Sequence, residues 1–402
     1  MQSRHIIPCA AAAAVAFASL AFGQLGELAP PAGPVADTGP HLGEIEPRTP
    51  ISNTGAPQTI DQPGSYYLTE NITSADQGIE ILAGGVTLDL NGFTISGDNG
   101  ATSPGASEYG IAVVPPFFNN APIVIKNGFI RNFFSDGVFY SNPNPTGALV
   151  VEGVHVIECG GDGIDTFGSV IVRNSSARAC GGDGFTHRPG VKGTYDNCIA
   201  ELNGQGFDVA YSTLSNCLAD NNTTGFFVNN SALNSCAASN SAGSGIVASG
   251  ASAINGCIAT DNGSDGIIGS SGSTIMNCVA RGNNTGISSG DGSTVANSTS
   301  SQNNGSGFSI GDGSRATNCT AEGNGLSGNG FGFLAATGST IDSCTARNNP
   351  FGFSASPGAL IIRCTASGNT TNYAIAAAAH GAIISLGFGA FSEPNSFANI
   401  EY

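Results

Sequence analysis

The sequence predicts an all-β solenoid built from coils of about 20 residues. Three observations predict it: cysteines recurring at that interval, asparagines in step with them, and short apolar alternation broken by glycine. After residue 60 there is no helical period. The recurring cysteines, with Ser298 dividing the longest gap, are Cys198, Cys217, Cys236, Cys257, Cys278, Cys319, Cys344 and Cys364.

Positions counted from each cysteine fall into register. Stacking the coils sets each strand about 4.8 Å from its copy and buries a core that no single coil could bury. An inward Asn bonded to the next Asn satisfies turn groups, at roughly 1 kcal/mol per bond. Five residues after the cysteine, or after Ser298, stand Asn203, Asn222, Ser241, Asn262, Asn283, Asn303, Asn324, Asn349 and Asn369.

The start of the repeat carries a family resemblance. Residues 62–68 read QPGSYYL, and residues 86–95 read VTLDLNGFTI. They resemble the cap and first coils of secreted right-handed parallel β-helix proteins, the pectate-lyase-like (pectin lyase-like) superfamily of bacterial proteins. The resemblance implies a right-handed parallel β-helix over residues 58–402, with capping segments at both ends and about 13 to 14 coils. This fold serves lyases, hydrolases, epimerases, adhesins and spacers alike, so it does not select an activity.

The N-terminal residues predict export. Residues 1–23 read as a signal peptide, with Arg4 ahead of an apolar stretch too short to span a membrane. Residues 24–57 form a Pro-rich leader. We therefore expect a secreted, periplasmic or cell-surface protein without a membrane span.

The charge balance narrows the range of partners. The chain has 12 Lys and Arg against 29 Asp and Glu, a net charge of −17. This argues against nucleic acid and anionic membranes as partners. A polyuronate would also be repelled unless Ca²⁺ intervened, so no cofactor is required by the sequence and Ca²⁺ stays open.

The cysteines allow two interpretations. Export invites disulfides, but stacked copies lie about 4.8 Å apart, whereas a disulfide needs Cβ atoms about 3.5 to 4.5 Å apart. We therefore predict a ladder of buried free thiols. Cys159 and Cys180, which stand in the asparagine column, are the pair most open to a bridge.

One outward column of side chains combines carboxylates with aromatic rings. On a strand, the residue after an inward Phe or Ile faces solvent, which places Phe139, Asp165, Thr186, Asp208 and Phe227 in one column. Asp165 and Asp208 lie two coils apart, about 9.6 Å, close to the roughly 6.5 to 9.5 Å of an inverting glycosidase pair. They are the candidate catalytic acids, and the candidate substrate-binding residues are Phe139, Tyr140, Asp162, Asp183, His187, Arg188, Tyr211 and Phe227.

A structural interpretation of the same residues stays open. Asp-Gly is ordinary turn chemistry, and His187 has the parity of a side chain that points toward the core. Residues 161–165 are similar to the acidic strand of polygalacturonases, and residues 206–208 to the Gly-Phe-Asp of mannuronan epimerases, but the catalytic residues that follow in those families are missing.

A second outward column is apolar in its first half and rich in Thr in its second. It is either an interaction face or a surface covered by a terminal segment. Three roles therefore stay open: engagement of a polysaccharide or cell-surface partner, a hydrolase, lyase or epimerase using Asp165 and Asp208, and a non-catalytic adhesin or spacer. The apolar residues of this column are Ile199, Leu218, Ala237, Ile258 and Val279.

Overall fold

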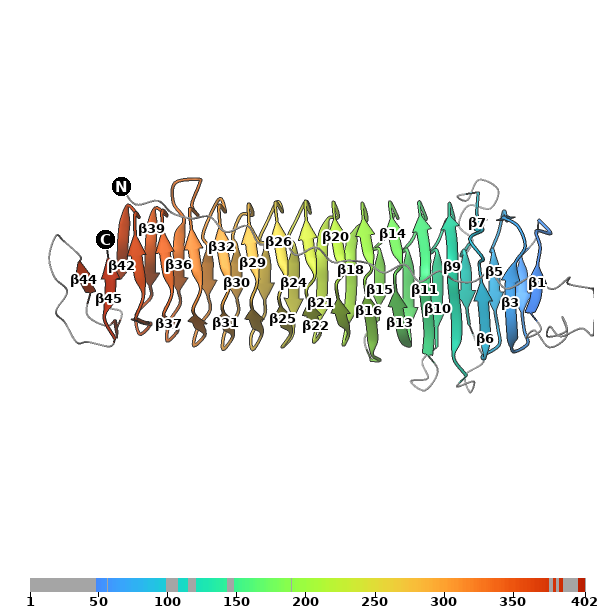
Figure 1. Ribbon diagram of the computed structural model, residues 1–402, viewed down its shortest axis with the longest axis horizontal. Coiled ribbons are helices and arrows are strands. Elements are labelled where there is room, and N and C mark those ends of the chain that lie inside the picture. The colour runs from blue at the N-terminus through green and yellow to red at the C-terminus, as the bar shows by residue number, and fades with distance from the viewer. Residues whose placement is uncertain are drawn as a thin grey trace, which may run out of the picture. The chain divides into compact units, whose positions relative to one another are not determined.

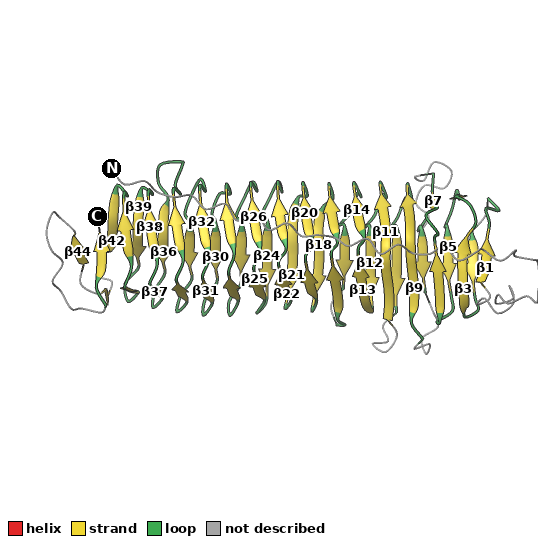
Figure 2. Ribbon diagram, viewed as in Figure 1, coloured by secondary structure: helices red, strands yellow, loops and turns green. Residues whose placement is uncertain are grey.

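Parallel β-strands make up the regular structure of the described part of the chain (Figure 2). The computed structural model describes residues 48–55, 57–98, 108–114, 121–142, 148–188, 190–375, 379–380, 383–385 and 397–401. Within these ranges no helix is long and apolar enough to cross a membrane. The predicted signal peptide, and the leader as far as Pro47, lie outside the described residues. Arg48–Tyr402 form one structural unit.

Each coil contributes a strand to each of three faces, and strands of one face lie side by side along the stacking axis (Figure 1). Face 1 is a separate 15-stranded parallel sheet. Its strands are β2 (Gln58–Ile60), β5 (Ile79–Ile81), β8 (Ile111–Val113), β10 (Val138–Ser141), β12 (Ile164–Phe167), β15 (Phe185–His187), β18 (Gln205–Ala210), β21 (Thr224–Asn229), β24 (Ile246–Ser249), β27 (Ile267–Gly269), β30 (Ile287–Ser289), β33 (Phe308–Ile310), β36 (Phe331–Ala335), β39 (Phe351–Ala355) and β42 (Thr371–Ile375).

Faces 2 and 3 form one 30-stranded sheet, because β9 (Ile123–Arg131) and β11 (Ala148–Ile157) run through both. Face 2 further contains β1 (Arg48–Ile51), β3 (Gly64–Leu68), β6 (Val86–Asp89), β13 (Ser169–Arg173), β16 (Gly193–Asp196), β19 (Thr213–Ser215), β22 (Ala232–Asn234), β25 (Ala253–Asn255), β28 (Thr274–Met276), β31 (Thr294–Ala296), β34 (Arg315–Thr317), β37 (Thr340–Asp342), β40 (Leu360–Ile362) and β43 (Ala379–His380). Face 3 further contains β4 (Ile72–Thr73), β7 (Thr94–Ser96), β14 (Ser176–Arg178), β17 (Ile199–Glu201), β20 (Leu218–Asp220), β23 (Ala237–Ser239), β26 (Ile258–Thr260), β29 (Val279–Arg281), β32 (Thr299–Ser301), β35 (Thr320–Glu322), β38 (Thr345–Arg347), β41 (Thr365–Ser367) and β45 (Asn399–Glu401), with β44 (Ile383–Ser385) paired to β45.

The core consists of side-chain columns that run from coil to coil. Phe185, Phe207 and Phe226 stack behind face 1 with ring centroids 4.7 and 4.8 Å apart. The predicted asparagine ladder is confirmed: Asn262 donates through Nδ2 to Oδ1 of Asn283 at 2.9 Å, and both side chains are buried. The ten cysteines of the described part are buried and free, Cys159 and Cys180 included. The predicted thiol ladder therefore holds.

The bend between faces 2 and 3 uses the left-handed backbone conformation. Asn197, Asn216 and Asn277 have φ of 52°, 55° and 56° at equivalent positions. Asn tolerates this conformation better than most residues with a side chain because its short polar side chain bonds locally. This accounts for the Asn that so often precedes the repeating cysteine.

The β-helix begins earlier in the sequence and has slightly more coils than predicted. The leader was expected to extend to residue 57, but β1 already pairs in parallel with β3. Pro50 lies within β1, which is tolerated because β1 is a terminal strand and Pro is confined to such edges. The 15 strands of face 1 exceed the predicted coil count, since β2 precedes the first coil counted from the sequence.

Candidate functional site

The predicted outward column on face 1 is present in the predicted register. Phe139 pairs with Asp165, Asp165 with Thr186, Thr186 with Asp208, and Asp208 with Phe227, on β10, β12, β15, β18 and β21. We call these five residues the face 1 column. The two carboxylates are two strands apart, about 9.6 Å between Cα atoms.

Asp165 faces outward but is not solvated. It is 3% exposed, and Arg188 of the next coil covers it, with Nη2 2.7 Å from Oδ2 and Nε 3.4 Å from Oδ1. Burial raises the pKa of Asp165, while the hydrogen bond and charge of Arg188 act in the opposite direction. Both oxygens of this carboxylate are engaged within the protein, which leaves it poorly placed to attack or deprotonate a ligand.

A ladder of aspartates runs beside the face 1 column. Each of its members lies in the turn that precedes a face 1 strand. Oδ1 of Asp136 accepts the backbone N–H of Asp162 at 2.7 Å, and Oδ1 of Asp162 accepts that of Asp183 at 2.7 Å. Asp183 does the same for Gln205 at 2.6 Å. Asp162 and Asp183, predicted as substrate contacts, therefore hold the turns together.

Asp136 is a member of this ladder that the sequence reasoning missed. Its signal was present, since Asp136 precedes Gly137 as Asp162 precedes Gly163. Burial, reinforced by the charges of Asp162 and Asp165, raises the pKa of Asp136 to about 7. Asp136 is consequently partly protonated near neutrality.

Asp208 is the more accessible carboxylate of the face 1 column. It is half-buried, next to the Phe227 ring, which is 38% exposed. Burial, followed by the charges of Asp183 and Asp162, raises the pKa of Asp208 to about 6. This group can therefore donate or accept a hydrogen bond at mildly acidic pH.

Two predicted ligand contacts point inward instead. Tyr140 and His187 are 1% and 2% exposed, so neither can touch a ligand on the outer surface. His187 lies 3.0 Å from the hydroxyl of Thr166 and 3.0 Å from the carbonyl oxygen of Val191. Strand alternation explains both: Tyr140 follows outward Phe139, and His187 follows outward Thr186.

The ring at the other end of the face 1 column has a partner of its own. Phe139 stacks on Tyr109 with ring centroids 4.6 Å apart and planes 13° apart. One side of the Phe139 ring is therefore occupied. Phe227 is the ring of the column that offers more free surface.

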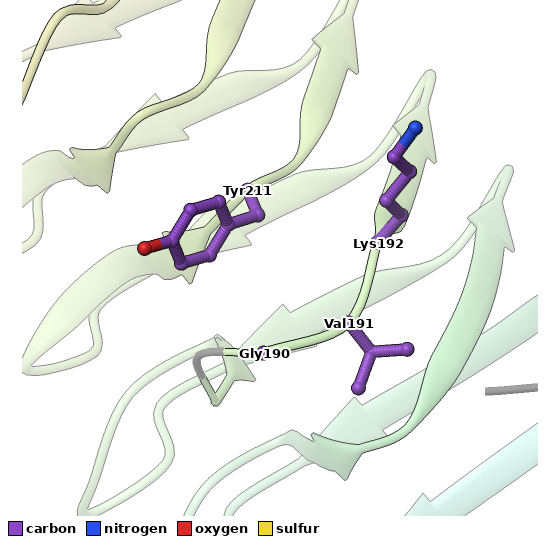
Figure 3. Close-up of a pocket in the computed structure, with 4 residues that line it drawn as sticks. All are labelled: Gly190, Val191, Lys192 and Tyr211. Carbon is purple, nitrogen blue, oxygen red and sulfur yellow. The ribbon is translucent and has the colours of Figure 1, made fainter. Parts of the chain in front are cut away.

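Tyr211 lies outside the face 1 column, just past the end of β18. It lines a hollow of about 400 Å³ together with Gly190, Val191 and Lys192. Figure 3 shows the Tyr211 ring beside the segment from Gly190 to Lys192. Lys192 is not among the site residues that the sequence predicts.

The described residues offer no group of three or more His, Cys, Asp or Glu side chains arranged to hold a metal ion.

The predicted apolar column on face 3 is present in register and partly exposed. Ile199, Ile258 and Val279 are 44%, 45% and 38% exposed, and Leu218 and Ala237 are half-buried.

Comparison with known families identifies the class of protein. The family model for the right-handed β-helix region matches residues 144–278 and 210–351, together more than half of the 402-residue chain. The chain therefore belongs to this family and is a right-handed parallel β-helix. No curated protein matches the sequence.

Solved structures with similar architecture are distant. The A-module of the mannuronan C-5 epimerase AlgE4 of Azotobacter vinelandii is 15% identical, with 81% of this chain and 86% of that chain covered and a TM-score of 0.33. The periplasmic alginate epimerase AlgG is 12% identical, with 81% and 75% covered and a TM-score of 0.37. Tailspike protein 3 of bacteriophage CBA120 is 11% identical, with 79% and 56% covered and a TM-score of 0.32. These values are too low to transfer an activity to this chain.

Proposed function

We propose that this protein is an exported β-helix that binds a polysaccharide along the face 1 column. The observation that carries the proposal is the Phe227 ring, 38% exposed on the strand next to half-buried Asp208. An aromatic ring offers an apolar platform to the C–H face of a sugar, and a neighbouring carboxylate bonds its hydroxyls. Arg188, whose side chain is 58% exposed, adds donors beside Asp165.

The shape and charge of the site favour an extended neutral polymer. The face 1 column follows the stacking axis over five strands, about 19 Å at the usual strand spacing. A net charge of −17 would repel a polyanion, whereas a neutral glycan is indifferent to it. We therefore place neutral polysaccharides first among candidate ligands.

Affinity electrophoresis tests this proposal. Full-length protein is run through native gels that contain xyloglucan, mixed-linkage β-glucan, galactomannan or polygalacturonate, each with Ca²⁺ or with a chelator. Retardation by at least one neutral polymer is expected. Unchanged mobility in every gel would contradict the proposal.

A second candidate function is a carbohydrate-active enzyme, a hydrolase, lyase or epimerase. The raised pKa of Asp208, about 6, favours it, because a proton donor works best with a pKa near the working pH. Asp165, the other candidate acid, is held by Arg188 and would have to leave it to act as base or nucleophile. Screens for reducing sugars and unsaturated products on the same polymers, with Asp208→Asn as the inactive control, distinguish catalysis from binding alone.

A third candidate function is engagement of a cell-surface partner through face 3. The exposed apolar residues Ile199, Ile258 and Val279 favour it, since contiguous apolar surface commonly marks an interface. The proposal that the protein is exported is based on the predicted signal peptide of residues 1–23.

N-terminal sequencing of the mature protein tests it and should give a start near Gln24.

A further inference from the structure

The hollow past the end of β18 differs from the face 1 column in its chemistry. The pairing of Thr194 with Thr213 places Lys192 beside Tyr211 on neighbouring coils, with backbones about 4.8 Å apart. Tyr211 and Lys192 therefore both line one space of about 400 Å³. This volume lies within the usual range of small-ligand sites.

Tyr211 occupies a backbone position that does not favour Tyr. Its φ is 52°, and the equivalent positions of the next two coils hold Asn230 and Gly250, with φ of 47° and 66°. Left-handed backbone at a residue with a large side chain is strained. The ring nevertheless stands 49% exposed, so core packing does not explain its presence.

Lys192 is an available cation in an acidic chain. The sequence has two lysines, and Lys126 lies 3.6 Å from the carboxylate of Asp89. Among the described carboxylates, none forms an ion pair with Lys192. Its ammonium group can therefore pair with a ligand.

The wall that carries Lys192 is fixed from within. Buried His187 contacts the carbonyl oxygen of Val191 at 3.0 Å, and the carbonyl oxygen of Lys192 accepts the N–H of Val170 at 3.3 Å. A ligand would meet a wall that is already ordered, which reduces the entropic cost of binding. His187 is thus a positioning residue for the hollow.

We propose that this hollow binds a single uronic acid unit at an end or branch of an otherwise neutral glycan. The Tyr211 ring would stack on the sugar, and the Lys192 ammonium would pair with its carboxylate. One acidic unit suits one lysine, whereas a polyuronate would be repelled by the net charge of −17. The inference extends the proposed function and has its own residues.

Calorimetric titration of the full chain tests whether the hollow binds a single uronic acid unit. The ligands are methyl β-glucuronide, methyl β-glucoside and polygalacturonate. The glucuronide should bind about five-fold or more tightly than the glucoside, as for a partly exposed ion pair. Lys192→Gln should remove that preference without changing glucoside binding. Tyr211→Asn, which suits the left-handed backbone, should weaken both glycosides, and Lys126→Gln should change neither.

Thermal melts of each variant establish that it is folded before its binding is interpreted. Equal affinity for the two glycosides, no detectable glucuronide binding, preferred binding of polygalacturonate, or a preference that survives Lys192→Gln would overturn the inference. Retention of neutral polymers in gels depends on Phe227 rather than Lys192. A negative calorimetric result therefore leaves polysaccharide binding by the face 1 column untouched. A negative gel result likewise leaves uronic acid binding in the hollow untouched.

Discussion

Arg188, directly after β15, covers Asp165 on β12 through a contact of 2.7 Å between Nη2 and Oδ2. A carboxylate that strand alternation directs toward solvent is thereby 3% exposed. The pair changes the chemistry of the face 1 column, because it removes one of two candidate acids from the surface. Asp208 is left as the carboxylate of the column that a ligand can reach.

The first prediction concerns this ion pair. Arg188→Gln should lower the free energy of unfolding by about 2 kcal/mol at neutral pH, less than for a fully buried pair because the guanidinium is exposed. Without Arg188 the pKa of Asp165, already raised by burial, rises further. The folded state then holds a proton that the unfolded state has lost, so acid should restore stability.

Urea unfolding at pH 5 and pH 8 measures the effect of Arg188→Gln. Asp165→Asn serves as the matched variant, since it leaves only an exposed guanidinium unpaired and should cost less. Equal losses in both variants, at both pH values, would contradict the account of a buried carboxylate.

The second prediction concerns the pH dependence of stability. The pKa of Asp136 is about 7 in the folded protein against an ordinary value of 3.8. Because the folded-state value is raised, the free energy of unfolding should fall as pH rises between these values and level off above them. Thermal melts from pH 4 to pH 8 should show a smaller slope for Asp136→Asn.

Asp291→Asn, at an exposed turn, is the control for that experiment. It should reproduce the slope of the parent protein. An Asp136→Asn variant with the parent's slope would show that this carboxyl group does not titrate in the range given.

The third prediction concerns the asparagine ladder. Ser241 interrupts it, and its hydroxyl is buried without a hydrogen-bond partner. Ser241→Asn should restore the missing bonds and raise the free energy of unfolding by about 1 kcal/mol. Asn283→Leu should lower it by about 1 to 3 kcal/mol, because Asn283 is fully buried and bonds to Asn262 and Asn303.

Denaturant unfolding of both variants provides the measurement. Opposite signs are the expected result. A destabilised Ser241→Asn together with an unaffected Asn283→Leu would show that the ladder contributes nothing to stability.

The fourth prediction concerns the thiols. Burial raises the pKa of Cys159 to about 12 and that of Cys180 to about 11, and burial also blocks access to the thiolate. In the folded protein, almost none of the described cysteines should therefore react with a thiol reagent such as Ellman's reagent. After unfolding without reductant, all ten described cysteines should react. Five disulfides found by mass spectrometry would refute the thiol ladder.

The register of the face 1 column could be predicted from the sequence, since period-2 alternation and a regular repeat fix both face and rung. The covering of Asp165 could not, because it depends on the conformation of the long Arg188 side chain from the next coil. Nearness along the chain puts Tyr140 and His187 in the predicted site, although their parity on the strand directs both side chains inward. The strand β1 was missed because Pro argues against a central strand and says nothing about a terminal one.

The dissociation constant of the Phe227→Ala variant for the polysaccharide that retards the parent most strongly tests the central claim directly. Loss of a stacked ring should weaken binding by about 1 kcal/mol, roughly five-fold. Phe129→Ala, which removes a ring of similar exposure, 40%, from another face, should bind like the parent. An unchanged constant for Phe227→Ala, or an equal loss in Phe129→Ala, would contradict polysaccharide binding along the face 1 column.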